Sequence, residues 1–194
     1  IRAINSGVVI EGFTLRDYDV GVLLWNANSD ATTYSFVVSG NHIVSNDSRG
    51  IHFTGVFTGV VRNNFIDDNY YYGIDFDKYT VKKGPEPVRI ENNIISGTVN
   101  RGVRIDGEAW VSLSGNTIRN HEWGVEILGK SNVSIDGDTI EYNISEGIRI
   151  FLAQNPVSIT NCVIRNNTYS GIASTTDSGH HIVSGNTITS NATG

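Results

Sequence analysis

The sequence of 194 residues contains only one cysteine and three prolines, and it has no long run of one charge. A single cysteine excludes an internal disulfide. The formal charge of −6, without long charge runs, argues against nucleic acid as a partner, because binding nucleic acid needs a basic face. No stretch approaches the ~18 consecutive apolar residues of a membrane-spanning helix, so we expect no membrane insertion.

The sequence does contain a repeat, and its clearest copy is residues 111–127, VSLSGNTIRNHEWGVEI. In outline the unit is V-x-[IVL]-x-[GN]-N-x-I-x-x-N, a short variable stretch, and then G-[VI]-x-[ILF]. Three positions of the unit recur at the same spacing from one another along the chain, and chance does not explain this agreement. They are the central residue (Leu15, Ile43, Ile66, Ile95, Ile118, Ile140, Ile164, Ile188), a glycine (Gly21, Gly50, Gly73, Gly102, Gly124, Gly147, Gly171) and a polar position before the isoleucine (Asn41, Asn64, Asn93, Asn116, Asp138, Cys162, Asn186).

Within each unit, apolar residues alternate with period two over a few positions and then stop at glycine or asparagine, which is typical of short strands. No segment carries a sustained helical period. The repeat therefore predicts an all-β fold, a single-stranded right-handed parallel β-helix of about eight coils. The asparagine position predicts a side-chain ladder at a turn. Because Cys162 replaces one of these asparagines, we expect a buried structural thiol.

The two ends of the sequence resemble the middle. The repeat is already present at residue 7, and the chain stops within a unit at Gly194. Neither end carries the cap that a stack of strands needs to block edge pairing. We therefore expect residues 1–194 to form one β-helix domain, a fragment of a longer extracellular or cell-surface protein whose other domains are its partners.

Alternation also predicts which side chains point outward, because every second residue of a strand does so and stacked coils align these residues in columns. The second residue after each glycine gives Leu23, His52, Asp75, Arg104, Glu126, Arg149 and Ala173. The fourth gives Trp25, Thr54, Asp77, Asp106, Leu128, Phe151 and Thr175. Ionisable residues gather in the middle coils, so we predict a charged patch on one face.

Asp75, Asp77 and Asp106 are the candidate catalytic residues of this patch. The backbones of Asp75 and Asp77 should lie ~6.6 Å apart along a strand, and those of Asp77 and Asp106 ~4.8 Å apart between coils. Glycosidases separate paired carboxylates by ~5–5.5 Å for retention or ~6.5–9.5 Å for inversion. Crowded carboxylates also raise the pKa of one member, which provides an acid beside a base.

The neighbours of these carboxylates are candidate substrate-binding residues. Arg104 would keep Asp75 ionised or bind a uronate, and His52 would move a proton. Glu126 and Arg149 extend the patch. Residues 26–35 and 78–87 are polar insertions that leave the same corner, so we expect them to flank the patch as walls. Trp25 and Tyr79 would serve as stacking platforms for sugar rings.

The alternative is a solvated face without a site. Outward residues of any soluble β-helix are polar, and Asp75–Arg104 and Glu126–Arg149 would then be ordinary pairs between neighbouring strands. The run Tyr70 to Tyr72 is interpreted as corner packing. For metals, Asp75, Asp77 and Asp106 offer oxygen ligands that suit Ca²⁺, but no calcium-binding repeat is present, and His180–His181 has no visible third ligand. We expect no cofactor.

The unit N-x-I-x-x-N-x-x-x-G-I-x-[LIF] resembles the parallel β-helix repeats of NosD-like and carbohydrate-binding, sugar-hydrolase proteins in the pectin-lyase-like superfamily. The resemblance covers residues 7–191. Such repeats also occur in archaeal surface proteins of the disaggregatase type, which act on a cell-envelope polysaccharide. Residues 72–77, YGIDFD, are partly similar to the YGFDPHD motif of mannuronan C5-epimerases, with Asp75 at the catalytic aspartate, but Phe76 and Asp77 stand where that family has proline and histidine.

Three hypotheses follow. The first is an extracellular glycoside hydrolase that degrades a cell-envelope or acidic polysaccharide, with polysaccharide as its partner. The second is a non-catalytic module of a surface protein that binds glycan or spaces other domains. The third, which rests on the resemblance, is a polysaccharide lyase or C5-epimerase. A β-helix scaffold by itself does not decide among them.

Overall fold

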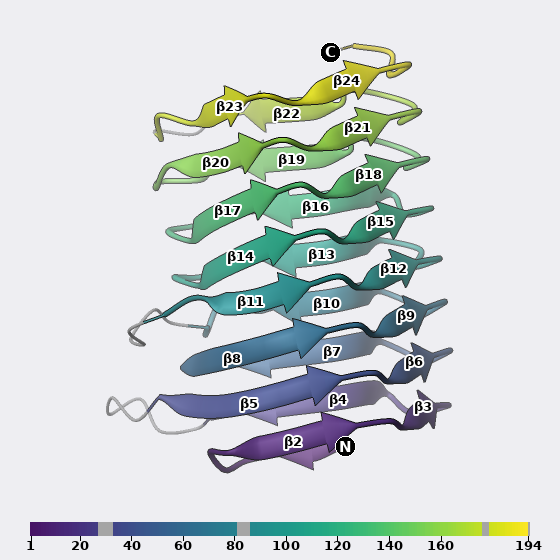
Figure 1. The fold of residues 1–194 in the computed structure, drawn as a ribbon, viewed down its shortest axis with the longest axis vertical. Coiled ribbons are helices and arrows are strands. Elements are labelled where there is room, and N and C mark those ends of the chain that lie inside the picture. Colours follow the sequence, from purple (N-terminus) through teal and green to yellow (C-terminus); the bar gives the residue numbers. More distant parts are fainter. Residues whose placement is uncertain (27–32, 81–85, 176–178, 194) are drawn as a thin grey trace.

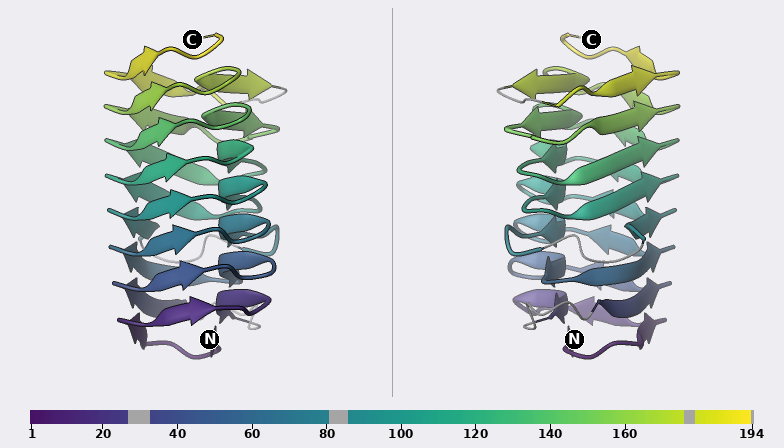
Figure 2. Two further views of the ribbon diagram at one scale, coloured as in Figure 1. Left: turned by 90° about the vertical axis from the view of Figure 1, so that its right-hand side faces the viewer. Right: turned by 90° about the vertical axis from the view of Figure 1, so that its left-hand side faces the viewer.

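The computed structural model describes residues 1–26, 33–80, 86–175 and 179–193, and these form a parallel β-helix (Figure 1). Each coil contributes one strand to each of three eight-stranded sheets, which we call sheets A, B and C. All strand pairs are parallel and join one coil to the next, at the ~4.8 Å spacing of paired strands. In the side views of Figure 2 the coils stack in register from the N-terminal to the C-terminal end.

The strands recur with the repeat, so that each sheet receives one strand from every coil. Sheet A holds β1 (Arg2–Ala3), β4 (Val20–Trp25), β7 (Arg49–Thr54), β10 (Tyr72–Phe76), β13 (Arg101–Ile105), β16 (Trp123–Ile127), β19 (Ile148–Phe151) and β22 (Ile172–Thr175). Sheet B holds β2 (Val8–Glu11), β5 (Tyr34–Ser39), β8 (Phe57–Arg62), β11 (Val88–Glu91), β14 (Trp110–Ser114), β17 (Asn132–Asp136), β20 (Val157–Thr160) and β23 (Ile182–Ser184). Sheet C holds β3 (Thr14–Arg16), β6 (His42–Val44), β9 (Phe65–Asp67), β12 (Ile94–Ser96), β15 (Thr117–Arg119), β18 (Thr139–Glu141), β21 (Val163–Arg165) and β24 (Thr187–Thr189).

The all-β prediction is confirmed, and the described residues contain no helix. The number of coils is slightly lower than expected. With eight strands in each sheet, the chain completes about seven full turns between the first strand of a sheet and the last. The rows of isoleucine and valine fill the interior, and the central isoleucines Ile43 to Ile164 are all fully buried. Phe53 and Phe76 add a stacked ring pair with centroids 4.3 Å apart.

The asparagine ladder forms as predicted at the turn from sheet B to sheet C. The amide of Asn64 donates to Asn93 Oδ1 at 3.0 Å, and Asn93 donates in the same way to Asn116 at 3.0 Å. Each amide also donates to a backbone carbonyl of the preceding coil, so a buried turn keeps its polar groups satisfied. Cys162 is buried in this ladder, and burial raises the pKa of its thiol to about 11.

From β4 onward, a glycine in or directly before each sheet A strand is required by close approach. A Cβ on Gly50 would lie 2.6 Å from the carbonyl oxygen of Gly73 and 2.7 Å from Cγ2 of Ile66. Any side chain here would push neighbouring coils apart. The glycine and the residue after it both face the interior, so the in-and-out alternation of the strand slips by one position at this point.

Candidate functional site

The charged patch lies on the outer face of sheet A, where the first predicted column is confirmed. Leu23, His52, Asp75, Arg104, Glu126, Arg149 and Ala173 occupy matched positions on consecutive strands. The backbone amide of Asp77 donates to Phe53 O, and that of Asp106 donates to Phe76 O. These two aspartates therefore also occupy equivalent positions on consecutive coils, directly after β10 and β13.

Asp75 differs from the expectation of an exposed outward residue, because its side chain is 0% exposed. Its Oδ2 accepts a hydrogen bond from Arg49 Nε at 2.6 Å, and its Oδ1 accepts one from Arg104 Nη1 at 3.1 Å. The long arginine side chains of the two neighbouring coils reach across it and exclude water. Asp75 thus cannot touch a substrate in this arrangement, and it holds both arginines in place.

Asp77 is partly accessible, with 18% of its side chain exposed. Its Oδ2 lies 3.2 Å from Nε2 of His52, and its Oδ1 accepts a hydrogen bond from the Tyr79 amide at 2.9 Å. Burial raises the pKa of Asp77, but the hydrogen bonds from His52 and Tyr79 outweigh burial, so the pKa lies below its usual value. Asp77 is therefore a carboxylate at neutral pH, and the imidazole of His52 lies beside it.

Arg104 connects the buried carboxylate to a second accessible one. Its Nη2 donates to Oδ2 of Asp106 at 2.6 Å, while its Nη1 donates to Asp75. Oδ1 of Asp106 accepts the amide of Gly107 at 2.6 Å, and 19% of the Asp106 side chain is exposed. Asp77 and Asp106 are the two predicted catalytic carboxylates that a substrate can reach.

Glu126 repeats the arrangement of Asp75 two coils further along the rod. It is 2% exposed, contrary to the expectation of a substrate-binding position. Arg101 Nε donates to its Oε2 at 2.7 Å, and Arg149 Nη1 donates to its Oε1 at 3.1 Å. The patch thus contains two buried carboxylates, each held between arginines from neighbouring coils. Arg149 itself is partly exposed.

Aromatic rings lie beside these arginines. The guanidinium carbons of Arg49 and Arg104 lie 5.4 and 5.7 Å from the centroid of Tyr72. Those of Arg101 and Arg149 lie 4.4 and 5.2 Å from the centroid of Trp123. Such cation–π contacts fix the planes of the guanidinium groups. Tyr72 therefore belongs to the charged face rather than only to corner packing.

Arg49, Tyr72, Arg101 and Trp123 form a third outward column that sequence reasoning missed. They pair strand to strand, and each directly precedes a glycine of the repeat. Strict alternation assigns the outward position to the glycine itself, but the one-residue slip at the glycine moves it one residue earlier. Four large or charged residues in a row before the glycines were the signal in the sequence.

The rings of the two predicted stacking residues contact cations other than the arginines that hold Asp75 and Glu126. Trp25 is partly exposed at the position matched to Thr54, and the Arg2 guanidinium lies 4.3 Å from its ring centroid. Tyr79 is exposed and contacts Lys78. The walls expected from the two insertions fall largely on residues 27–32 and 81–85, which lie outside the described part of the chain.

Two family models match the sequence. One, described as a right-handed β-helix region, matches residues 79–194, and the other, described as periplasmic copper-binding protein (NosD), matches residues 3–133. The chain belongs to the NosD-like right-handed β-helix proteins. The predicted handedness and the resemblance to NosD-like β-helix proteins are thereby confirmed, while the resemblance to archaeal surface proteins of the disaggregatase type stays a prediction.

One solved structure similar to this NosD-like β-helix is the enzymatically active domain of tailspike protein 2 from bacteriophage CBA120. The TM-score is 0.65 at 13% identity, and the alignment covers 91% of this chain and 31% of that one. At this identity the likeness concerns the fold alone, and the chain spans about a third of that structure's length. No curated protein matches the sequence.

No metal site is evident in the described residues of the NosD-like β-helix. Among them, no group of three or more histidine, cysteine, aspartate or glutamate side chains is placed to hold an ion. His181, of the predicted histidine pair, accepts a hydrogen bond from the Val157 amide at 3.1 Å through Nδ1. Because the described residues contain no helix, none of them forms a helix that could cross a membrane.

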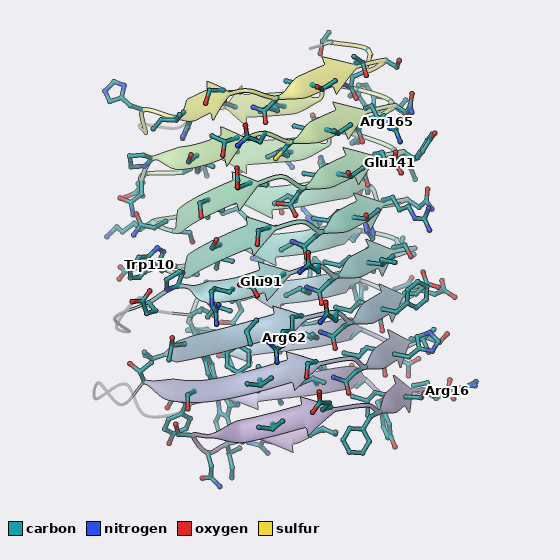
Figure 3. The ribbon with its side chains drawn as sticks, in the orientation of Figure 1. Arg16, Arg62, Glu91, Trp110, Glu141 and Arg165 are labelled. Atoms are coloured by element: carbon teal, nitrogen blue, oxygen red, sulfur yellow. The ribbon has the colours of Figure 1, made fainter. Side chains whose placement is uncertain are left out.

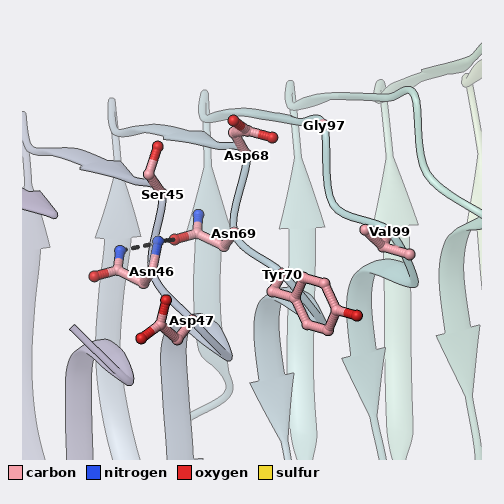
Figure 4. Close-up of a pocket in the computed structure, with 8 residues that line it drawn as sticks. All are labelled: Ser45, Asn46, Asp47, Asp68, Asn69, Tyr70, Gly97 and Val99. Carbon is pink, nitrogen blue, oxygen red and sulfur yellow. Dashed lines mark hydrogen bonds between the residues drawn. The ribbon is translucent and has the colours of Figure 1, made fainter. Parts of the chain in front are cut away.

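Two hollows of the surface differ in their relation to the charged face. One of about 440 Å³ lies at the turn from sheet C to sheet A, beside the buried hydrogen bond between Asn46 and Asn69 (Figure 4). It contains Asp47, Asp68 and Tyr70 but none of the predicted site residues. The other, of about 310 Å³, includes Arg149 and lies on the sheet A side.

Proposed function

We propose that the outer face of sheet A binds a polysaccharide outside the cytoplasm. The observation that supports this most is the row of partly exposed His52, Asp77, Arg104, Asp106 and Arg149, with aromatic rings beside it. Sugars present many hydroxyl groups that both donate and accept hydrogen bonds, and a row of fixed donors and acceptors matches them. The coil spacing of ~4.8 Å gives an elongated surface along which a polymer can lie.

The comparisons bear on two parts of this proposal, the location of the protein and the suitability of the scaffold. The NosD family model carries the description periplasmic, which favours a location outside the cytoplasm, periplasmic, extracellular or at the cell surface. The tailspike domain of the same fold is described as enzymatically active, so the scaffold is compatible with catalysis. We propose no cofactor or metal for binding.

Glycoside hydrolysis is the second candidate function, and the pair Asp77–His52 favours it. Hydrolysis breaks the bond between the anomeric carbon and the bridging oxygen, adds the hydroxyl of water to the carbon and gives the proton to the departing oxygen. Asp77, ionised and accessible, would act as base or nucleophile, and Asp106 would be its partner carboxylate. Asp75 would position Arg104 and His52 rather than react.

The test uses the 194-residue chain and a panel of polysaccharides, with galactomannan, laminarin and arabinogalactan as neutral probes and polygalacturonate and alginate as acidic ones. Affinity electrophoresis reports binding, and new reducing ends report hydrolysis. We expect Asp77→Asn to lower the rate of any cleavage by about 10²–10⁴-fold, because it removes a base. Asp136→Asn, on the exposed outer face of sheet B, is the matched control and should leave the rate unchanged.

The outcomes separate the hypotheses. Retention without any product from the wild-type chain would leave a binding module and exclude hydrolysis. Products with unsaturated ends that absorb in the ultraviolet would indicate a lyase, and altered uronate stereochemistry without cleavage would indicate an epimerase. If no member of the panel retards the wild-type chain, the binding proposal is wrong.

A further inference from the structure

The second hollow extends the charged face toward the C-terminal coils. It has a volume of about 310 Å³ and is lined by Trp123, Ser145, Glu146, Arg149, Tyr169, Ala173 and Thr175. Its cause is a change of side-chain size along the outward columns. Arg149 is followed on the next strand by Ala173, and Phe151 is followed by Thr175. Small residues leave space where the preceding coils place large ones.

The hollow offers one fixed donor and one fixed acceptor. Arg149 is held by its single hydrogen bond to Glu126 and by the rings of Trp123 and Phe151, so its remaining N–H groups have no partner among the described residues. Glu146 accepts a hydrogen bond from Nε1 of Trp123 at 2.6 Å through Oε2. Its Oε1 remains as an acceptor at the wall of the hollow.

Tyr169 supplies the open aromatic surface. It is 60% exposed, whereas the ring of Trp123 already contacts the guanidinium groups of Arg101 and Arg149. The formal charges around the hollow cancel, because the two arginines are balanced by Glu126 and Glu146. An anionic ligand would face Glu146, and a cationic ligand would face Arg149. A neutral ligand with hydroxyl groups satisfies both.

We propose that this hollow is a subsite for one uncharged pyranose unit of the polysaccharide. The hydroxyl groups would accept from Arg149 and donate to Glu146, while one face of the sugar ring would lie on Tyr169. The volume is at the lower end of the ~300–1,000 Å³ of small-molecule sites, which suits a single ring. The inference rests on the proposed binding function and adds a site and a sugar class to it.

Two variants test the subsite in the intact 194-residue chain. Tyr169→Ala removes the aromatic surface, and Ala173→Leu fills the hollow without removing any partner. Tyr169→Ala should weaken retention by the neutral probes about tenfold, because an aromatic contact and its buried area are lost. Ala173→Leu should weaken it by a similar factor, because the larger side chain occupies the space of the sugar ring. Tyr18→Ala is the matched control, since Tyr18 is 58% exposed at the opposite end of the rod and should leave retention unchanged. Circular dichroism verifies the fold of each variant.

Three results would overturn the subsite. Unchanged retention by galactomannan, laminarin and arabinogalactan in both variants would remove the subsite while the binding function stands. Retention by polygalacturonate or alginate alone, lost in both variants, would show that the hollow takes an acidic sugar instead. Absence of retention by every probe in the wild-type chain would remove the binding function, and the subsite with it.

Discussion

Sheets A and B share one scaffold but present different outer faces. On three consecutive coils sheet A carries Arg104, Glu126 and Arg149 at matched positions, while sheet B carries Ser112, Ser134 and Ser158. Both faces rest on the same buried rows of isoleucine and valine. On these three coils the outer face of sheet B therefore consists of small neutral side chains, whereas that of sheet A consists of charged ones.

Most of the other ion pairs are more exposed than those of sheet A, although Glu141 on sheet C is itself nearly buried, with 9% of its side chain exposed. Figure 3, which views sheets B and C, labels Glu91 on sheet B and the pair Glu141–Arg165 on sheet C. Arg89 and Glu91 pair at 3.1 Å with 55% and 25% of their side chains exposed. Desolvating ions is costly, and surface pairs avoid that cost. Sheet A is set apart by several ion pairs whose carboxylates, on Asp75 and Glu126, are 0% and 3% exposed.

The largest expected effect comes from removing the buried anion of sheet A. Asp75→Ala leaves Arg49 and Arg104 without their shared partner, so we expect the free energy of unfolding to fall by about 3–5 kcal/mol. Urea unfolding measures it. Ser134→Ala on sheet B is the control and should change stability by no more than about 0.5 kcal/mol. An Asp75→Ala variant as stable as the control would mean that the ion pairs do not form.

A smaller effect is expected at Asp138, which is buried in the asparagine ladder between sheets B and C. Its Oδ1 accepts two hydrogen bonds from Asn116, but its Oδ2 has no partner among the described residues. Burial raises its pKa from 3.8 to about 7. Asp138→Asn restores the amide of the other copies, so we expect it to stabilise the fold at pH 8 by about 2 kcal/mol.

The carboxyl group of Asp138 should also make the stability of the fold depend on pH. The folded pKa of Asp138 exceeds the unfolded one, so the stability from its proton is complete below about pH 4 and is lost as the pH rises to about 7. The gain from Asp138→Asn should therefore shrink toward pH 4. The pKa of buried His121 is lowered by burial to about 4, which acts in the opposite direction. The contribution of Asp138 is therefore measured as the difference in the free energy of unfolding between the Asp138→Asn variant and the wild type. A difference that does not change with pH would contradict the raised pKa of Asp138.

The smallest effect is expected at the Glu141–Arg165 pair on sheet C, in which 9% of the glutamate side chain is exposed but the arginine is open to solvent. Arg165 Nε lies 2.8 Å from Oε2 of Glu141, but 47% of the arginine side chain is exposed. Water and salt screen such a pair. Arg165→Ala should leave the urea midpoint unchanged within error at 0.15 M salt. A loss comparable to that of Asp75→Ala would remove the contrast between the two faces.

The fold could be predicted from the repeat, because a regular spacing along the chain places equivalent residues of successive coils on top of one another. The spacing of Ile43, Ile66 and their equivalents fixes which residues stack, and from that the first outward column followed correctly. The slip at each glycine was not visible, because it depends on a close approach between coils that only three-dimensional packing reveals. That slip hid Arg49 and Arg101.

The burial of Asp75 and Glu126 was equally beyond the sequence pattern. Period two predicts that a side chain points away from the interior, but not whether its neighbours cover it. Arginine side chains are long enough to reach one coil along the rod, so the outward carboxylate between two arginines becomes the most buried member of the patch. The catalytic assignment of Asp77 and Asp106 remains a prediction.

The most direct test of a polysaccharide-binding face on sheet A is a crystal structure of the chain soaked with oligosaccharides from whichever polysaccharide retards it. We predict sugar density along the outer face of sheet A, against His52, Asp77, Arg104 and Asp106. Density confined to the serine face of sheet B would contradict the account. So would a soak of an oligosaccharide that binds in solution but leaves sheet A empty.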